Sequence, residues 1–178
     1  MSFANRASAK VFRDKLEIPV IQGGMGVGIS MGKLAGSVAA CGGMGVISTA
    51  LIGFREEDFY QNHVEADVRA LRKEIQIAKE IANGRGMIAI NAMTVTTDYR
   101  ECIEAAVREG IDAIISGAGL PLALPELVDD KDVLIAPIVS SAKAAALIMR
   151  SWNKKCERKP DFIVVEGSGA GGHLGFKK

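Results

Sequence analysis

Short apolar runs alternate with longer segments of helical spacing along most of the chain. The apolar runs cover residues 19–22, 45–50, 87–92, 113–116, 133–139 and 161–165. Their length and composition predict β-strands. Residues 30–40, 66–82, 98–109, 121–127 and 141–152 carry apolar residues at helical spacing or a high content of helix-forming residues, and we expect helices there. The first helix has Ser30 as its expected N-cap and Gly42-Gly43 as its stop.

Six strands joined by mostly helical crossovers predict parallel strands that are buried on both faces. Every expected strand ends in glycine or polar residues: Gln22-Gly23, Ser48-Thr49, Asn91, Ser116-Gly117, Ser140-Ser141 and Glu166-Gly167. A doubly wound sheet concentrates its site at one crevice. Sites built from all the strand ends are typical of the (β/α)₈ TIM barrel, which we therefore favour.

A complete barrel has eight strands and typically about 250 residues, whereas this chain has 178 residues. We therefore expect residues 1–178 to form one domain, the N-terminal part of an incomplete barrel without strands seven and eight. On this interpretation, the polypeptide is a truncated form of a longer product.

Composition narrows the function classes. Hydrophobic residues make up 48% of the chain, and 22 basic residues nearly balance 21 acidic ones, so no strong field favours nucleic acid or an anionic membrane. We see no apolar run long enough for a membrane span and no signal peptide. The three cysteines are far apart, which indicates neither a zinc site nor a disulfide framework. A reducing, cytoplasmic setting fits best, and assembly into a homo-oligomer is left open.

Two features near strand ends could bind a ligand. Gly23, Gly24 and Met25 follow the first strand, where glycines let the backbone approach a ligand; a plain tight turn is the alternative. Asn91 interrupts a buried apolar run and needs partners, which either neighbouring backbone or a ligand could supply.

The strongest candidate for chemistry is the loop over residues 166–175. A buried strand runs into Glu166, then small residues, and then His173, whose imidazole suits proton transfer near neutral pH. By contrast, we interpret His63 and Lys143 as ordinary surface residues.

These motifs together resemble the nitronate monooxygenase family, which includes flavin-dependent enoyl-acyl-carrier-protein reductases. The resemblance rests on Ile-Pro-Val-Ile-Gln-Gly-Gly-Met (18–25), Leu-Ala-Gly (34–36), Gly-Gly-Met-Gly-Val-Ile (42–47), Asn91, Ser-Gly-Ala-Gly-Leu-Pro (116–121) and Glu-Gly-x-x-Ala-Gly-Gly-His-Leu-Gly (166–175). It implies a barrel that holds FMN at its C-terminal face. The residues it implies for FMN binding are Gly23, Gly24, Met25, Asn91, Gly117, Gly119, Ser140, Glu166, Gly171 and Gly172.

The resemblance also implies that His173 is the catalytic acid/base. Two reactions are compatible with it: oxidation of nitronates or nitroalkanes by O₂ to a carbonyl compound and nitrite, and NAD(P)H-dependent reduction of an enoyl thioester. An inactive fragment is a third interpretation, because barrels of this kind usually bind phosphate on loops after strands seven and eight.

Overall fold

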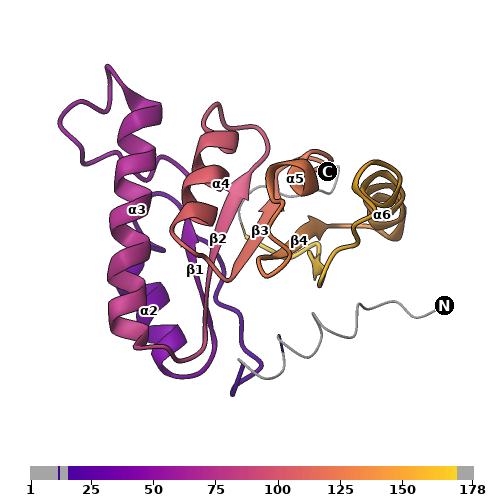
Figure 1. Ribbon diagram of the computed structural model, residues 1–178, viewed down its shortest axis with the longest axis horizontal. Coiled ribbons are helices and arrows are strands. Elements are labelled where there is room, and N and C mark those ends of the chain that lie inside the picture. The colour runs from indigo at the N-terminus through magenta and orange to yellow at the C-terminus, as the bar shows by residue number, and fades with distance from the viewer. Residues whose placement is uncertain (1–11, 13–15, 172–178) are drawn as a thin grey trace.

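The computed structural model describes residue 12 and residues 16–171. Its elements are α2 (Gly32–Ala40), β1 (Met44–Ser48), α3 (His63–Ala82), β2 (Met87–Met93), α4 (Tyr99–Arg108), β3 (Ala113–Gly117), α5 (Leu124–Leu127), β4 (Leu134–Val139), α6 (Ala142–Cys156) and β5 (Val164–Val165). The strands form one parallel sheet in the order β1-β2-β3-β4-β5. Helices follow the strands on one side of this curved sheet (Figure 1). The expected incomplete (β/α)₈ barrel is confirmed.

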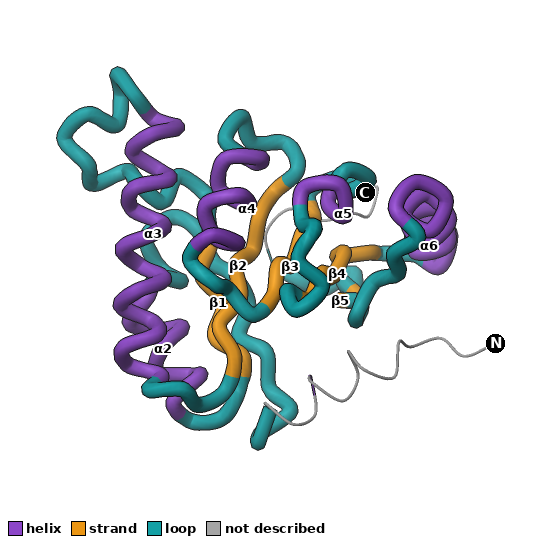
Figure 2. Tube along the Cα trace, viewed as in Figure 1, coloured by secondary structure: helices purple, strands orange, loops and turns teal. Residues whose placement is uncertain are grey.

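The first expected strand is shorter than the apolar run 19–22 predicts. It makes one isolated parallel bridge, Ile21 with Met44, supported by hydrogen bonds from Met44 N to Val20 O and from Gln22 N to Met44 O. Pairing of the main chain stops at Gln22, and the next residues form a long loop (Figure 2). The expected second strand is therefore β1 of the structure.

The start of α2 also differs from the prediction. Its N-cap is Met31, without a side-chain capping bond, so the assignment of Ser30 as N-cap is wrong. A carboxylate from α3 caps the helix instead: Gly32 N donates to Glu74 Oε2 at 2.7 Å. Negative charge is favourable at a helix N-terminus. The Ser30 hydroxyl is engaged elsewhere, because the loop before it folds back onto it.

Side chains alternate between the two faces of the sheet, and each face has its own core. The outer core packs strand residues such as Ile47, Ile90 and Ile114 against the helices. The inner core is small: Met44, Val46, Met87, Ala89, Ala113, Ile115, Leu134 and Ala136 fill it. Phe12 and Phe162 pack against it, with ring centroids 5.0 Å apart. Continuing the alternation beyond this core places Ser48, Asn91 and Gly117 on the inner face, at the carboxyl ends of their strands.

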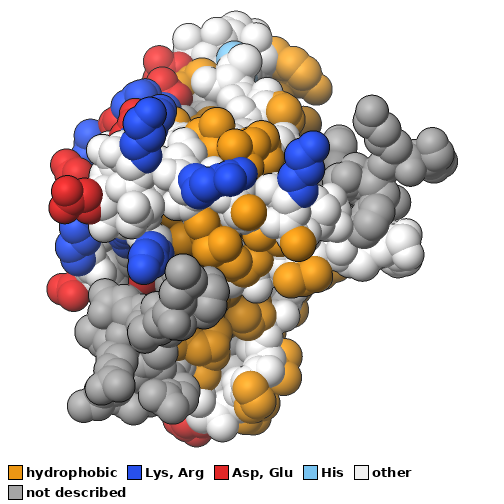
Figure 3. Space-filling view, turned by 90° about the vertical axis from the view of Figure 1, so that its right-hand side faces the viewer, with side chains coloured by type: hydrophobic (Ala, Val, Ile, Leu, Met, Phe, Trp, Pro, Cys, Tyr) orange, Lys and Arg blue, Asp and Glu red, His pale blue; other side chains and the backbone are white. Residues whose placement is uncertain are grey.

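Hydrophobic side chains are also exposed on the side of the molecule that carries α6. They form a strip down this face, crossed by lysine and arginine side chains (Figure 3). Leu147 on α6 is 43% exposed and Val165 on β5 is 77% exposed. Within the described ranges, no helix is both long and apolar enough to cross a membrane.

Candidate functional site at the carboxyl ends of the strands

The loop over residues 23–29 lies across the carboxyl ends of β1 and β2. A Cβ atom on Gly24 would stand 2.4 Å from Asn91 Cβ, and one on Gly28 would stand 2.8 Å from the ring of Phe54. Such distances leave no room for a side chain. The glycines therefore allow this loop to lie directly on the strand ends and on the loop after β1.

Three apolar residues of the same loop are exposed. Met25, Val27 and Ile29 are 47%, 43% and 57% exposed, so the loop presents three apolar side chains at the surface. Gly23, in contrast, has nothing within 4 Å of an added Cβ. The loop thus has a glycine side in contact with the protein and an apolar side available to a ligand.

Gln22 ends the first strand by putting its side chain in place of the next peptide group. Its Oε1 accepts from Val46 N at 3.1 Å, and its Nε2 lies 3.1 Å from Val46 O. These are the two main-chain groups that a continuing parallel strand would have bonded. The side-chain amide satisfies them, and the main chain is free to leave the sheet at Gly23.

Ser30 closes the same loop from its other end. The side chain is fully buried, and its Oγ accepts from Met25 N at 2.8 Å and from Gln22 Nε2 at 2.8 Å. It lies 3.1 Å from Gly23 O, to which it donates. All the bonding capacity of this hydroxyl is used within the loop. Beyond it, Ser30 O accepts from Ser48 N at 2.9 Å, which returns the chain to the sheet.

Asn91 stands beneath this loop on the inner face of β2. It is half-buried, and its carbonyl accepts from both N and Oγ1 of Thr49, at 3.1 and 3.2 Å. Among the described residues, no hydrogen-bond partner is found for its side-chain amide. In the described part of the chain, the Asn91 amide therefore does not bond to neighbouring backbone, which was the alternative interpretation. An amide in this place can both donate to and accept from a ligand.

Thr94 joins the loops that follow β2 and β3. Its N donates to Gly117 O and its Oγ1 donates to Ala118 O, both at 2.9 Å. A Cβ atom on Gly119, which has φ +138°, would lie 2.2 Å from that hydroxyl oxygen. Gly117 and Gly119 are thereby held next to the Asn91 strand end.

The remaining predicted residues come from the far side of the half-barrel. Ser140 follows β4 and Glu166 follows β5; both are half-buried, and Glu166 N donates to Val139 O at 2.8 Å. Gly171 is exposed, with open space around an added Cβ. Gly172 and His173 lie outside the described residues.

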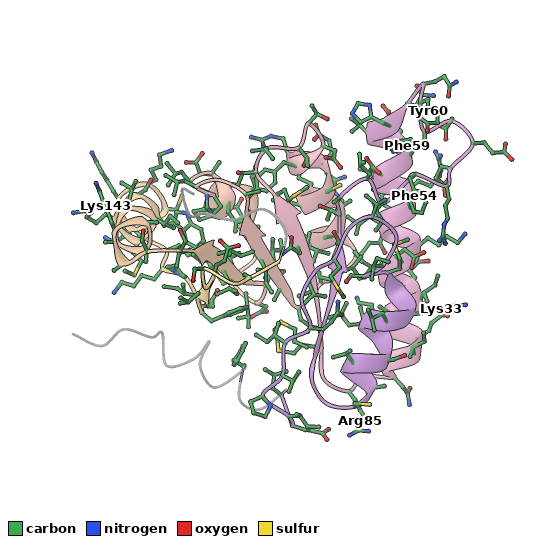
Figure 4. The ribbon with its side chains drawn as sticks, turned by 180° about the vertical axis from the view of Figure 1, so that it is seen from behind. Lys33, Phe54, Phe59, Tyr60, Arg85 and Lys143 are labelled. Carbon is green, nitrogen blue, oxygen red and sulfur yellow. The ribbon has the colours of Figure 1, made fainter. Side chains whose placement is uncertain are left out.

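The two residues assigned to the surface lie there. His63 is the exposed first residue of α3, with Nε2 3.0 Å from Thr97 Oγ1. Lys143 is exposed on α6 and points away from the sheet (Figure 4). Neither contributes to the strand-end site.

A buried acidic group supports the loop after β1. Asp67 is 1% exposed, and its Oδ1 accepts from Gly53 N at 2.6 Å. The pKa of Asp67 is raised to about 6: burial is the largest cause, the hydrogen bond from Gly53 lowers the pKa, and the charge of Asp98 raises it. Burial also raises the pKa of the Cys102 thiol, which donates to Asp98 Oδ2 at 3.1 Å. A thiol in this state is protonated at neutral pH and is no nucleophile.

A cavity also lies at the opposite end of the strands. A cavity of about 520 Å³ is lined by Glu17, Lys79, Ala82, Gly84, Arg85, Gly86, Ile88, Gly110 and Asp112. Figure 4 shows Arg85 at this end, and Phe59 and Tyr60 at the other. Active sites of barrel enzymes form at the carboxyl ends, so we assign this cavity no catalytic role. The described residues contain no cluster of histidine, cysteine and acidic side chains suited to a metal ion.

Sequence reasoning missed two residues that build the site. The sequence pattern places Gln22 only at the end of the first expected strand, and it assigns Ser30 to helix capping. One signal for Ser30 was available: a serine between a glycine-rich loop and a helix can bond to either. The pairing of Gln22 with Val46 depends on the register between the first strand and β1, which cannot be read from the sequence.

Comparison with known proteins gives a consistent result. A profile described as nitronate monooxygenase matches residues 9–178, and no curated protein sequence matches the chain. FabK from Thermotoga maritima has a similar structure, with a TM-score of 0.72 and 20% identity over 96% of this chain and 46% of that chain. A nitroalkane oxidase from Streptomyces ansochromogenes has a TM-score of 0.69 and 14% identity, over 91% and 50%. At these identities the structures support the fold alone. The chain spans about half the length of either protein.

Proposed function

The chain belongs to the nitronate monooxygenase family, and from this premise we propose that it forms the FMN-binding part of a flavin-dependent oxidoreductase that oxidises nitronates. The observation that carries the proposal is the amide of Asn91, which has no hydrogen-bond partner among the described residues and is held beneath Gly24 at the carboxyl end of β2. Backbone and amide groups that lack protein partners at this end of a barrel suit a polar, planar ligand.

The residues present fit a flavin. Met25 offers an exposed apolar side chain for the isoalloxazine ring system, and Gly23 and Gly24 allow the backbone to approach it. Asn91 would hydrogen-bond to the ring or the ribityl chain. Gly117, Gly119, Ser140, Glu166, Gly171 and Gly172 would line the remaining side. When bound, FMN supplies the redox chemistry, and the protein supplies orientation and proton control.

In the proposed reaction, His173 removes a proton from the carbon next to the nitro group, or receives the nitronate already formed. An imidazole can hold that proton at neutral pH because its ordinary pKa lies near 6.5. With O₂ as oxidant, the products are a carbonyl compound and nitrite. Substitution of His173 by Asn should remove most activity toward neutral nitroalkanes but less toward pre-formed nitronates. Equal losses on both substrates would argue against the role of a base.

Binding of FMN is tested directly on this chain. Titration of FMN, followed by quenching of flavin fluorescence, should give about tenfold weaker binding for Asn91→Leu than for the unmodified chain, because a hydrogen bond to the ligand is lost. Asn153→Leu changes an exposed asparagine on α6 and is the matched control. Equal affinities for the three proteins would contradict the assignment of Asn91.

The reaction is tested separately, with the loaded protein. Release of nitrite from a nitronate under air supports the proposed activity. Bleaching of the flavin by NAD(P)H without oxygen, followed by turnover of a crotonyl thioester, would instead assign enoyl-thioester reduction.

A further inference from the structure

The main chain of residues 23–29 has few hydrogen bonds to the sheet of its own. Its pairing with β1 stops at Gln22 and resumes at Ser30, and its apolar side chains are exposed. Exposed apolar side chains would normally draw such a loop into a collapsed form. Other interactions must therefore keep the glycines in contact with the strand ends and the apolar side chains exposed.

Gln22 is placed to do this. Its Nε2 lies 2.6 Å from Gly23 O, 2.8 Å from Ser30 Oγ and 3.1 Å from Val46 O, and its Oε1 accepts from Val46 N. One side chain therefore joins the first residue of the loop, the residue that follows the loop, and the neighbouring strand. These partners are all uncharged, so an amide, which donates and accepts without charge, matches them.

We propose that Gln22 is a positioning residue for the loop over residues 23–29: its amide replaces a peptide unit beside Val46 and so fixes Gly24 against Asn91. The inference rests on the proposed function only in naming FMN as the ligand of this loop. The geometry of the loop can be tested without any ligand.

The Gln22 amide accepts a hydrogen bond from Val46 N and donates hydrogen bonds to its other partners. Two variants separate these two functions. Gln22→Glu keeps an oxygen that can accept from Val46 N. As a carboxylate it cannot donate to Gly23 O, Ser30 Oγ or Val46 O, whereas the protonated acid can donate once. Gln22→Met has similar length and neither donates nor accepts well.

Hydrogen exchange of backbone amides, resolved by NMR, measures both functions of the Gln22 amide. In Gln22→Glu at pH 8, the amides of Met25 and Ser30 should lose about tenfold in protection, while that of Val46 stays protected. At pH 3, below the ordinary Glu pKa of about 4.3, the protonated acid should restore Met25 and Ser30 to within about threefold of the unmodified chain. In Gln22→Met all three amides should lose protection at both pH values.

Gln61→Glu, an exposed glutamine in the loop after β1, is the control and should change none of these amides. Protection at Ile114 in β3 serves as the internal reference for overall folding. If Gln22→Glu does not fold at pH 8, the comparison of Gln22→Met with the unmodified chain at both pH values decides whether Gln22 positions the loop. Unchanged protection of Val46 in Gln22→Met, or equal loss in Gln22→Glu at pH 3 and pH 8, would overturn the inference.

The same variants then bind FMN in the fluorescence titration. A loosened loop together with weaker FMN binding supports both proposals. A loosened loop with unchanged FMN affinity supports the positioning role of Gln22 and counts against FMN as the ligand of this loop.

Discussion

Gly24 lies so close to Asn91 that a methyl group on Gly24 would stand 2.4 Å from Asn91 Cβ. Carbon atoms that are not linked through covalent bonds do not pack at that distance, so either the loop or the strand end would have to move. Gly24 was expected in a turn and Asn91 in a strand, and this contact joins the two.

The first prediction follows from this contact. Gly24→Ala should lower the free energy of unfolding by about 1–3 kcal/mol, the usual cost of overpacking, whereas Gly23→Ala should change it by less than about 0.5 kcal/mol because the space beside Gly23 is open. Urea denaturation of the two variants measures the difference. Equal stabilities would contradict the close approach of the loop.

Removal of the Ser30 hydroxyl should be costly. Ser30→Ala leaves Met25 N and Gln22 Nε2 without their shared acceptor in a buried place, and we expect a loss of about 2–3 kcal/mol. Ser37→Ala is the control: Ser37 is exposed on α2 and donates only to Lys33 O, so its loss should stay near zero. If Ser30→Ala were as stable as Ser37→Ala, the hydroxyl would not hold the loop.

Asn91 should reveal a conflict between stability and binding. Its amide is half-buried and lacks a partner among the described residues. Asn91→Leu, which keeps the branching at Cγ, should therefore leave the protein as stable or raise the free energy of unfolding by about 1 kcal/mol, even as FMN binding weakens. Thermal unfolding without ligand measures this effect. A clear destabilisation would show that the amide serves the fold rather than a ligand.

Asp67 should make stability depend on pH. Its pKa is raised to about 6 in the folded chain, above the ordinary value near 3.9 in the unfolded chain. The folded state therefore binds more protons between these values, and stability falls as pH rises from about 4 to 6. The full effect is about 3 kcal/mol above pH 6.

Asp67→Asn removes that ionisation while its Oδ1 can still accept from Gly53 N. The variant should be more stable than the unmodified chain at pH 8 and similar to it at pH 4. Urea denaturation at both pH values measures the change. The same stability difference at pH 4 and pH 8 would show that ionisation of Asp67 is not the cause.

Much of the fold followed from the sequence, because hydrophobic periodicity is a local property. Runs such as residues 87–92 and 113–116 are apolar on both faces, and the structure places them in β2 and β3 with helices packed against them. The glycine and polar residues at the strand ends were likewise predicted to share one edge, since parallel strands put their carboxyl ends together. The structure brings Gly24, Asn91, Gly117 and Gly119 to that edge.

Only the tertiary structure decided how the first strand ends and what Ser30 does. Whether Gln22 bonds to solvent or to Val46 depends on the register of two segments separated by a helix, and a hydroxyl beside a helix can cap it or tie a loop. Glu74, a residue of α3, took the capping role at Gly32, which left Ser30 for the loop. The sequence by itself determined which residues could serve the site, and long-range packing decided which of them hold it and which remain open to a ligand.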